Sequence, residues 1–175
     1  VSAEAFEAFS SPNYPLLAEA GVHIAVNHNR LFKSTQGAFK VNSTLDASVG
    51  VLTLFPGMSE EQLLAQLGSK NQRALIFQTF GSGNASQQPW FLKALGTAIE
   101  NGLIVLNVTQ CMKGKVEQGK YATSKALLDM GVIGGSDLTL EAAITKMMFL
   151  LGQSADTNWI KTQLIANIRG ELSVS

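Results

Sequence analysis

Cysteine and histidine are scarce in this 175-residue sequence, which has one cysteine, Cys111, and two histidines, His23 and His28. A single cysteine excludes an internal disulfide framework and fits a reducing compartment, so we expect a cytoplasmic location. The histidines are five residues apart on an expected strand, which would direct them to opposite faces. We therefore predict two surface histidines and no metal site.

The sequence also lacks an excess of either charge and a long hydrophobic run. Lys plus Arg number 13 and Asp plus Glu number 13, and no basic cluster with interleaved aromatics is present, so nucleic acid and anionic membrane are not expected partners. No run reaches the roughly 18 apolar residues of a membrane span. The start, VSAEAFEAF, has no initiator methionine and no signal-peptide pattern, and we expect a piece cut from a longer protein.

Short β-branched runs alternate with amphipathic segments from Val49 onward, which is typical of βαβ units. The sequence therefore predicts an α/β fold: a three-layer, Rossmann-like domain with a short, mostly parallel sheet flanked by helices. Residues 1–48 are interpreted as a linker and an arm, with an edge strand or a hairpin arm at 22–32, and residues 49–175 as the α/β domain. Strands are expected at 49–55, 74–80 and 103–109, a strand or turn at 131–135, and helices at 59–68, 89–101, 124–130, 139–151 and 156–168.

Capping residues support these helix positions. Ser59 followed by Gln62 predicts a capping box, and Gly68 a helix end. Pro89 suits a first helical position, and Thr139 an N-cap.

Two glycines follow the second expected strand in QTFGSGNASQQPW, residues 78–90. Gly81 and Gly83 are not followed by the third glycine of a dinucleotide fingerprint, and no Walker pattern is present, so a nucleotide is not expected. A tight turn and a ligand-binding loop both remain open. Asn84 carries both a donor and an acceptor, which suits an amino acid or amide better than a phosphate.

Polar residues gather where two adjacent strands are expected to end, and ligands bind beyond these ends in doubly wound sheets. They are Thr79, Ser82, Asn84, Thr109, Gln110 and Cys111. Hydroxyls, amides and a thiol without a histidine or carboxylate indicate binding rather than acid–base chemistry.

Cys111 has no histidine nearby in sequence, so we interpret it as a packed small residue and not a nucleophile. Lys113, Lys115 and Lys120 are interrupted by glycines and a glutamate, and we interpret them as solvated surface rather than an anion site.

Five ordered motifs together resemble the C-terminal domain of bacterial type I, cytoplasmic L-asparaginases, in the asparaginase/glutaminase family. They are LTLFPGM, QTFGSGNA, LIVLNVTQCMKGKV, YATSKALLDMGVIGGSDLTLEAAITKMMFLL and IRGEL. The early segment FEAFSSPNYPLLAEAGV resembles the family's interdomain linker. The resemblance covers essentially the whole chain.

The resemblance implies hydrolysis of L-asparagine to L-aspartate and ammonia by a Thr-Asp-Lys group of an N-terminal domain that this chain lacks. It places no catalytic residue in this chain, which alone would be inactive. It further implies a homo-oligomer, dimer or tetramer, and no cofactor. Glutamine as substrate, and a non-catalytic amino-acid sensor module, remain alternatives.

Site residues also follow from the resemblance. Asn84 matches the asparagine that contacts substrate bound in a neighbouring subunit. Thr109 and Cys111 match the lining of an allosteric asparagine site, and Gln78 stands where a regulated relative has arginine. Glutamine keeps hydrogen bonding but loses the charge that would hold a carboxylate, which argues against allosteric control.

Overall fold

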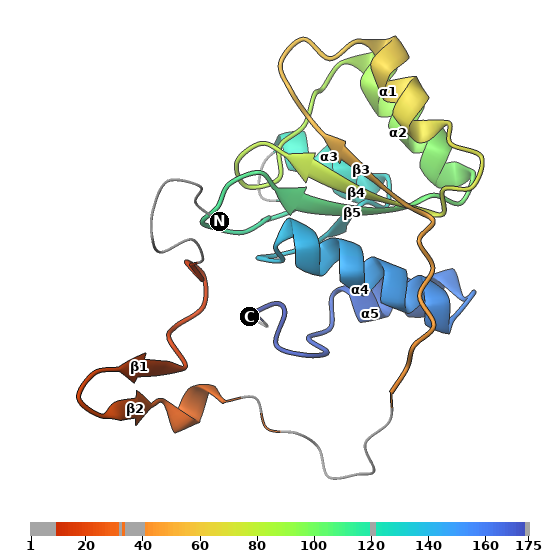
Figure 1. Cartoon of the computed structure of the whole chain (residues 1–175). Coiled ribbons are helices and arrows are strands. Elements are labelled where there is room, and N and C mark those ends of the chain that lie inside the picture. Colours follow the sequence, from red (N-terminus) through yellow and green to blue (C-terminus); the bar gives the residue numbers. More distant parts are fainter. Residues whose placement is uncertain (1–9, 32, 34–40, 120–121, 174–175) are drawn as a thin grey trace. The chain divides into compact units, whose positions relative to one another are not determined.

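A computed structural model of the chain describes residues 10–31, 33, 41–119 and 122–173 (Figure 1). The chain divides into two compact units, Val1–Val41 and Asn42–Ser175. The division lies seven residues before the boundary at 48/49 that the sequence predicts.

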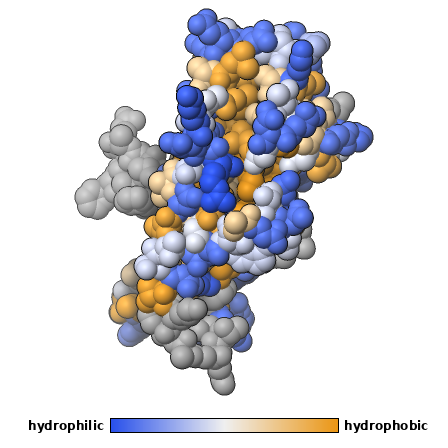
Figure 2. Space-filling model, turned by 90° about the vertical axis from the view of Figure 1, so that its right-hand side faces the viewer, coloured by the Kyte–Doolittle hydropathy of each residue, from blue (hydrophilic) through white to orange (hydrophobic). Residues whose placement is uncertain are grey.

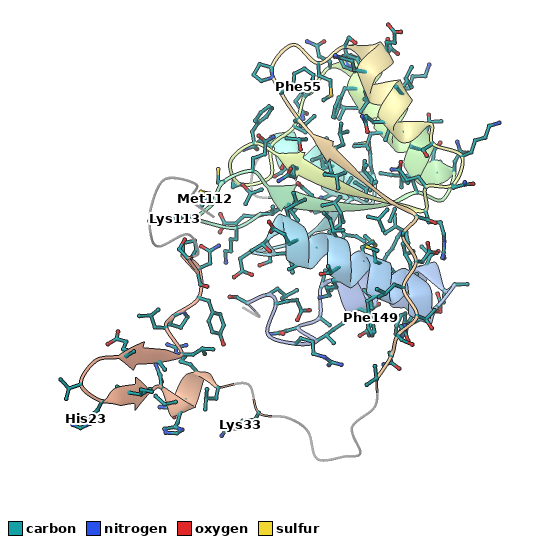
Figure 3. All side chains as sticks on the ribbon, viewed as in Figure 1. His23, Lys33, Phe55, Met112, Lys113 and Phe149 are labelled. Atoms are coloured by element: carbon teal, nitrogen blue, oxygen red, sulfur yellow. The ribbon has the colours of Figure 1, made fainter. Side chains whose placement is uncertain are left out.

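The first unit contains a small hairpin. Strand β1 (Ala18–Ala20) pairs antiparallel with β2 (Ile24–Val26), and a single 3-10 turn, η1 (His28–Arg30), follows. Of the two structures that the sequence left open, the hairpin is the one formed. Both histidines are exposed as predicted, but the expectation that they share a strand is wrong, because β2 is only three residues long and His23 precedes it while His28 lies in η1 (Figure 3).

The second unit is built on a four-stranded parallel sheet, which confirms the α/β prediction. Its order is β3-β4-β5-β6, with β3 (Val49–Thr53), β4 (Ala74–Thr79), β5 (Ile104–Thr109) and the two-residue β6 (Ile133–Gly134). The two central strands are apolar along almost their whole length because helices cover both sheet faces.

Helices form one layer on each face of the sheet (Figure 1). One layer contains α1 (Glu60–Leu67), α2 (Pro89–Glu100) and α3 (Ala122–Asp129), and the other contains α4 (Leu140–Gln153) and α5 (Thr157–Leu164). Strand alternation divides the core between the two layers: Phe77 packs with the α1, α2 and α3 side, and its neighbour Ile76 with the α4 and α5 side.

The predicted helix starts are confirmed except that of α3, which begins at Ala122, two residues before the predicted start. Ser59 and Gln62 form a reciprocal capping box, in which the Gln62 N–H donates to Ser59 Oγ and the Ser59 N–H to Gln62 Oε1. Pro89 opens α2, and Thr139 caps α4 by accepting from the Ala142 N–H. These local signals position the strand-to-helix loops that carry the candidate site.

The last helix is shorter than predicted, since α5 ends at Leu164 rather than near residue 168. The backbone N–H groups of Ile168 and Arg169 donate to the Glu171 side chain instead of to helix carbonyls, and the Gly170 N–H donates to Asn167 Oδ1. Side-chain acceptors thus replace the helical hydrogen bonds after Leu164. Ile168 still packs on the core, as its spacing suggested.

Hydrophobic and hydrophilic residues are mixed on the surface. On the face shown in Figure 2, hydrophobic residues form a band between hydrophilic groups in the upper part of the view. Among the residues described, no helix is both long and apolar enough to cross a membrane. The apolar helix faces serve to cover the sheet.

Candidate functional site

The loops after β3, β4 and β5 leave the same edge of the sheet, because the strands are parallel. After β4, residues Phe80–Asn84 form a closed turn: the Phe80 N–H donates to Asn84 O at 3.0 Å and the Asn84 N–H to Phe80 O at 2.8 Å. Gly81 and Gly83 have φ angles of 53° and 109°, a region that favours glycine. The tight turn that the sequence allowed is therefore present.

Three successive carbonyl oxygens of this turn are each bound from outside it. Gly81 O accepts from the Thr109 hydroxyl at 2.6 Å, Ser82 O from the Glu117 N–H at 3.0 Å, and Gly83 O from Asn107 Nδ2 at 3.3 Å. The turn is thus fixed to the end of β5 on one side and to the segment after β5 on the other.

Asn107 is a residue of this site that sequence reasoning missed. It is fully buried on β5, and its Oδ1 accepts from the Thr79 hydroxyl at 2.7 Å. A signal was available, because Asn107 is a polar residue in the middle of the apolar run LIVLNVT. A buried amide of this kind is stable only when it is hydrogen-bonded.

Asn84 closes the turn and is half-buried. Its Nδ2 lies over Gly81, 3.7 Å from the position that a β-carbon there would take. The carboxamide is thus carried by a turn whose backbone is held at every position from Phe80 to Asn84.

The three residues matched to an allosteric site do not all lie together. Thr109 and Cys111 do, since the Cys111 N–H donates to Thr109 Oγ1 at 3.0 Å. Gln78 is directed to the opposite face of the sheet, where its Oε1 accepts from Thr53 Oγ1 at 2.6 Å. Gln110 joins the strand ends by donating from Nε2 to Leu54 O.

Cys111 is exposed, so its interpretation as a packed residue is wrong. It lies two residues beyond Thr109, the last residue of β5. Phe55 and Met112, in the loops after β3 and β5, are exposed large hydrophobic residues (Figure 3). Lys113 and Lys115 are exposed as predicted, and Lys120 lies outside the described residues.

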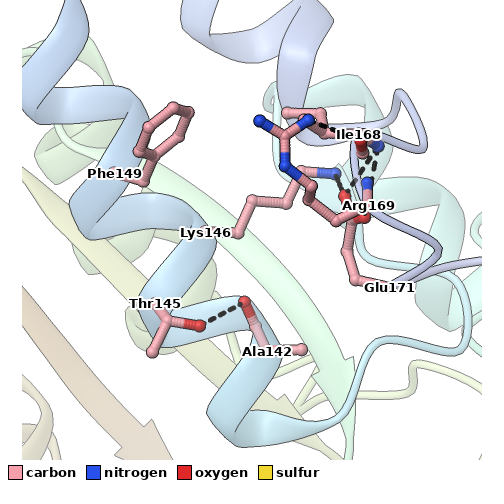
Figure 4. Close-up of a pocket in the computed structure, with 7 residues that line it drawn as sticks. All are labelled: Ala142, Thr145, Lys146, Phe149, Ile168, Arg169 and Glu171. Atoms are coloured by element: carbon pink, nitrogen blue, oxygen red, sulfur yellow. Dashed lines mark hydrogen bonds and ion pairs between the residues drawn. The ribbon is translucent and has the colours of Figure 1, made fainter. Parts of the chain in front are cut away.

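A separate pocket of about 240 Å³ lies between α4 and the C-terminal segment (Figure 4). It is lined by Ala142, Thr145, Lys146, Phe149, Ile168, Arg169 and Glu171. Burial raises the pKa of Glu171, but hydrogen bonds from Lys146 and from the backbone outweigh it and lower the pKa to about 2. This carboxylate is engaged in structural bonds and is not a candidate proton carrier.

Metal ligands do not gather in the part of the chain that the structure describes: no group of three or more His, Cys, Asp or Glu side chains there could hold an ion. The candidate site consists of amides, hydroxyls and one thiol. Its chemistry is hydrogen bonding to a polar ligand.

Known proteins resemble this chain along nearly its whole length. It is 42% identical to L-asparaginase 1 of Escherichia coli K12 over 98% of this chain and 50% of that protein, and 40% identical to an L-asparaginase of Dirofilaria immitis over 97% of this chain and 29% of that one. The crystal structure of L-asparaginase I from Vibrio cholerae superposes with a TM-score of 0.90 at 44% identity, covering 99% of this chain and 52% of that chain.

The chain spans about half the length of the E. coli enzyme and of the Vibrio structure that it matches. Residues 48–164 match the Glutaminase/Asparaginase C-terminal domain family. Fold, sequence and extent of match agree, and the chain belongs to this family.

Proposed function

We propose that this chain is the C-terminal half of an L-asparaginase, which hydrolyses L-asparagine to L-aspartate and ammonia, and that it supplies Asn84 to the active site of a neighbouring subunit. The observation that carries the proposal is the closed turn Phe80–Asn84, which holds a carboxamide at the edge of the sheet where ligands bind in this fold class.

A carboxamide suits this role because it can donate and accept at once. It would bind a zwitterionic amino acid without adding a charge beside the reacting groups, and so would not shift the pKa of a nearby lysine by charge–charge interaction. The nucleophile and its proton relay would come from the missing N-terminal half. The strand-end residues of this chain offer no general base to replace them.

The proposal implies a homo-oligomer, since Asn84 would act in another subunit. It also places the protein in the cytoplasm, as expected for the type I enzymes that the sequence resembles. Exposed Phe55 and Met112 support the homo-oligomer, because apolar side chains beside a site are common in protein interfaces. The N-terminal half would be the second partner.

The test is ammonia release by the full-length protein, compared between the wild type and Asn84→Ala. We expect kcat/KM for L-asparagine to fall at least tenfold. Asn101→Ala is the matched control, because Asn101 is an exposed asparagine at the end of α2, before β5 begins. Unchanged kcat/KM in Asn84→Ala, or turnover by the isolated 175 residues, would reject the proposal. The same assay with L-glutamine determines the substrate preference.

A second candidate is amino-acid binding without catalysis, at an allosteric or sensor site. The observation that favours it is the contact between Thr109 and the exposed Cys111 segment. Calorimetric titration of the chain with asparagine, aspartate and glutamine tests it. Binding that Thr109→Val abolishes would support this function, and the absence of heat in all three titrations would count against it.

A further inference from the structure

We propose that Asn107 is a positioning residue for the reaction: its buried carboxamide fixes Gly83 and thereby aims Asn84 at the substrate of the neighbouring subunit. This inference rests on the proposed function and adds to it a residue that touches neither substrate nor reacting atoms.

The hydrogen bonds of Asn107 permit one orientation of its amide. Gly83 O can only accept, so the amide nitrogen must face it, at 3.3 Å. Oδ1 then faces Thr79, whose hydroxyl donates to it at 2.7 Å. Gly83 O therefore determines which side of the Asn107 amide meets the turn, and the Thr79 hydroxyl satisfies the amide oxygen on the other side.

Burial makes each of these hydrogen bonds difficult to replace. Asn107 and Thr79 are both 0% exposed, so water is not at hand to replace a lost partner, and a buried polar group without a partner is strongly disfavoured. The backbone of Asn107 is held as well, because its carbonyl accepts from the Gly135 N–H at 2.7 Å. Neither the strand nor the side chain can shift easily.

Gly83 is confined from two sides. A β-carbon at Gly83 would lie 3.2 Å from Asn107 Nδ2 and 2.9 Å from Val116 Cγ1. The next residue is Asn84, whose backbone N–H and carbonyl are both bonded to Phe80. A displacement of Gly83 is therefore transmitted to Asn84 through one peptide bond, in a turn too short to absorb it.

The first test is Asn107→Leu in the full-length protein, which keeps the approximate side-chain shape and removes both hydrogen bonds. We expect kcat/KM for L-asparagine to fall about tenfold to a hundredfold, the range that a displacement of about 1 Å produces in an active site. The division of the loss between kcat and KM should match that of Asn84→Ala, since both changes would remove the same contact.

A double-mutant cycle on kcat/KM distinguishes an effect of Asn107 through Asn84 from a general loss of structure. If Asn107 acts through Asn84, the double variant should be no more than about twofold worse than Asn84→Ala alone. Losses that multiply would show that Asn107 acts independently of Asn84, and would overturn the inference.

Thr79 offers a second route that does not depend on the folding of Asn107→Leu. Thr79→Val keeps the shape and loses the hydroxyl, whereas Thr79→Ser keeps the hydroxyl. We expect Thr79→Val to lower kcat/KM several-fold and Thr79→Ser to restore it to within about twofold of the wild type. Equal activity of the two variants would contradict the inference.

Ser124→Ala is the control for the loss of a buried hydrogen bond to a loop. Ser124 is 0% exposed, and its Oγ accepts from the Gly119 N–H at 3.1 Å, outside the turn. Ser124→Ala should lower the thermal midpoint and leave kcat/KM within twofold of the wild type.

The outcomes distinguish the positioning role from the proposed function. Loss of activity in Asn84→Ala with full activity in Asn107→Leu and Thr79→Val would overturn only the positioning role. Full activity in Asn84→Ala would overturn the proposed function, and the positioning role with it.

Discussion

Lys146 on α4 and Glu171 near the end of the described chain form a largely buried ion pair, with Nζ 2.6 Å from Oε1 and side chains only 5% and 16% exposed. Lys146 also donates to Ala166 O at 2.5 Å, and Glu171 accepts from the Arg169 N–H at 2.6 Å. The pair therefore connects the segment after α5 to α4.

Removal of one partner should destabilise the fold strongly. In Lys146→Met the Glu171 carboxylate would stay buried without its counter-charge, and we expect a loss of about 3 kcal/mol in the free energy of unfolding. Denaturant unfolding of the chain measures it.

The exposed pair Lys125–Asp129 on α3 provides the control, with side chains 63% and 59% exposed. Lys125→Met should change the free energy of unfolding by no more than about 0.5 kcal/mol. Similar losses in the two variants would contradict the interpretation of the Lys146 pair.

Acid should destabilise the chain between about pH 5 and pH 2. The pKa of Glu171 is lowered from 4.5 to about 2, and that of Asp46 from 3.8 to about 2, the latter by hydrogen bonds from Ser48 and then from Arg73. In this range the unfolded chain binds more protons than the folded chain, so stability is complete above the unfolded pKa values and falls as the pH drops.

Glu171→Gln isolates one part of this effect. The variant should be less stable than the wild type at pH 7 and should lose less additional stability on acidification. Thermal midpoints measured at pH 7, 5, 4 and 3 test this, and parallel curves for the two proteins would rule out a contribution from Glu171.

Replacing glycine by alanine should change the free energy of unfolding in opposite directions at two helical positions, Gly152 and Gly96. At Gly152 in α4, a β-carbon would collide with the Thr44 carbonyl group and lie 3.0 Å from Leu45 Cα. These are backbone atoms that cannot rotate away, so we expect Gly152→Ala to lower the free energy of unfolding by about 1–3 kcal/mol.

Gly96 in α2 is the matched position, because its nearest neighbour would be Met130 Sδ at 3.5 Å, an ordinary contact. Gly96→Ala should therefore raise stability by up to about 1 kcal/mol through helix propensity. Differential scanning calorimetry of both variants makes the comparison, and a stabilised Gly152→Ala would show that the segment before β3 moves freely.

Gly81 and Gly83 should also differ. Gly81→Ala keeps a left-handed φ of 53°, and its β-carbon would make only an ordinary contact, with Asn84 Nδ2 at 3.7 Å, so it should lower the free energy of unfolding by about 1–2 kcal/mol. Gly83→Ala combines a φ of 109° with a collision at Val116 and a tight contact with Asn107, and should lower the free energy of unfolding by more than that. Chemical denaturation orders the two variants, and equal losses would argue against the confinement of Gly83.

Much of the fold was predictable because its signals are local. The capping box at Ser59, Pro89 at the start of α2 and Thr139 at the start of α4 each act within one helical turn, so a short stretch of sequence contains the whole signal. The end of α5 was not predictable, because the side chain that interrupts it, Glu171, is held by Lys146 from another helix.

The candidate site was also predictable only in part. The glycine turn and Asn84 could be located from spacing and residue type alone. The position of Cys111 was misjudged, because general burial statistics do not say which individual cysteine is exposed. Asn107 was overlooked, since its partners, Thr79 and Gly83, are 28 and 24 residues away in sequence.

Residue order alone was enough to specify the α/β class and the helix starts at Ser59, Pro89 and Thr139, since propensity and capping depend on near neighbours. At Gly81 and Gly83 it left a tight turn and a ligand-binding loop both open. The three-dimensional packing decided which buried groups meet: the amide of Asn107 with Gly83, and the ammonium of Lys146 with Glu171. The physical reason is that a buried polar group must find its partner across strands and helices, and the parallel register and helix layers that bring the partners together form only when the whole domain folds.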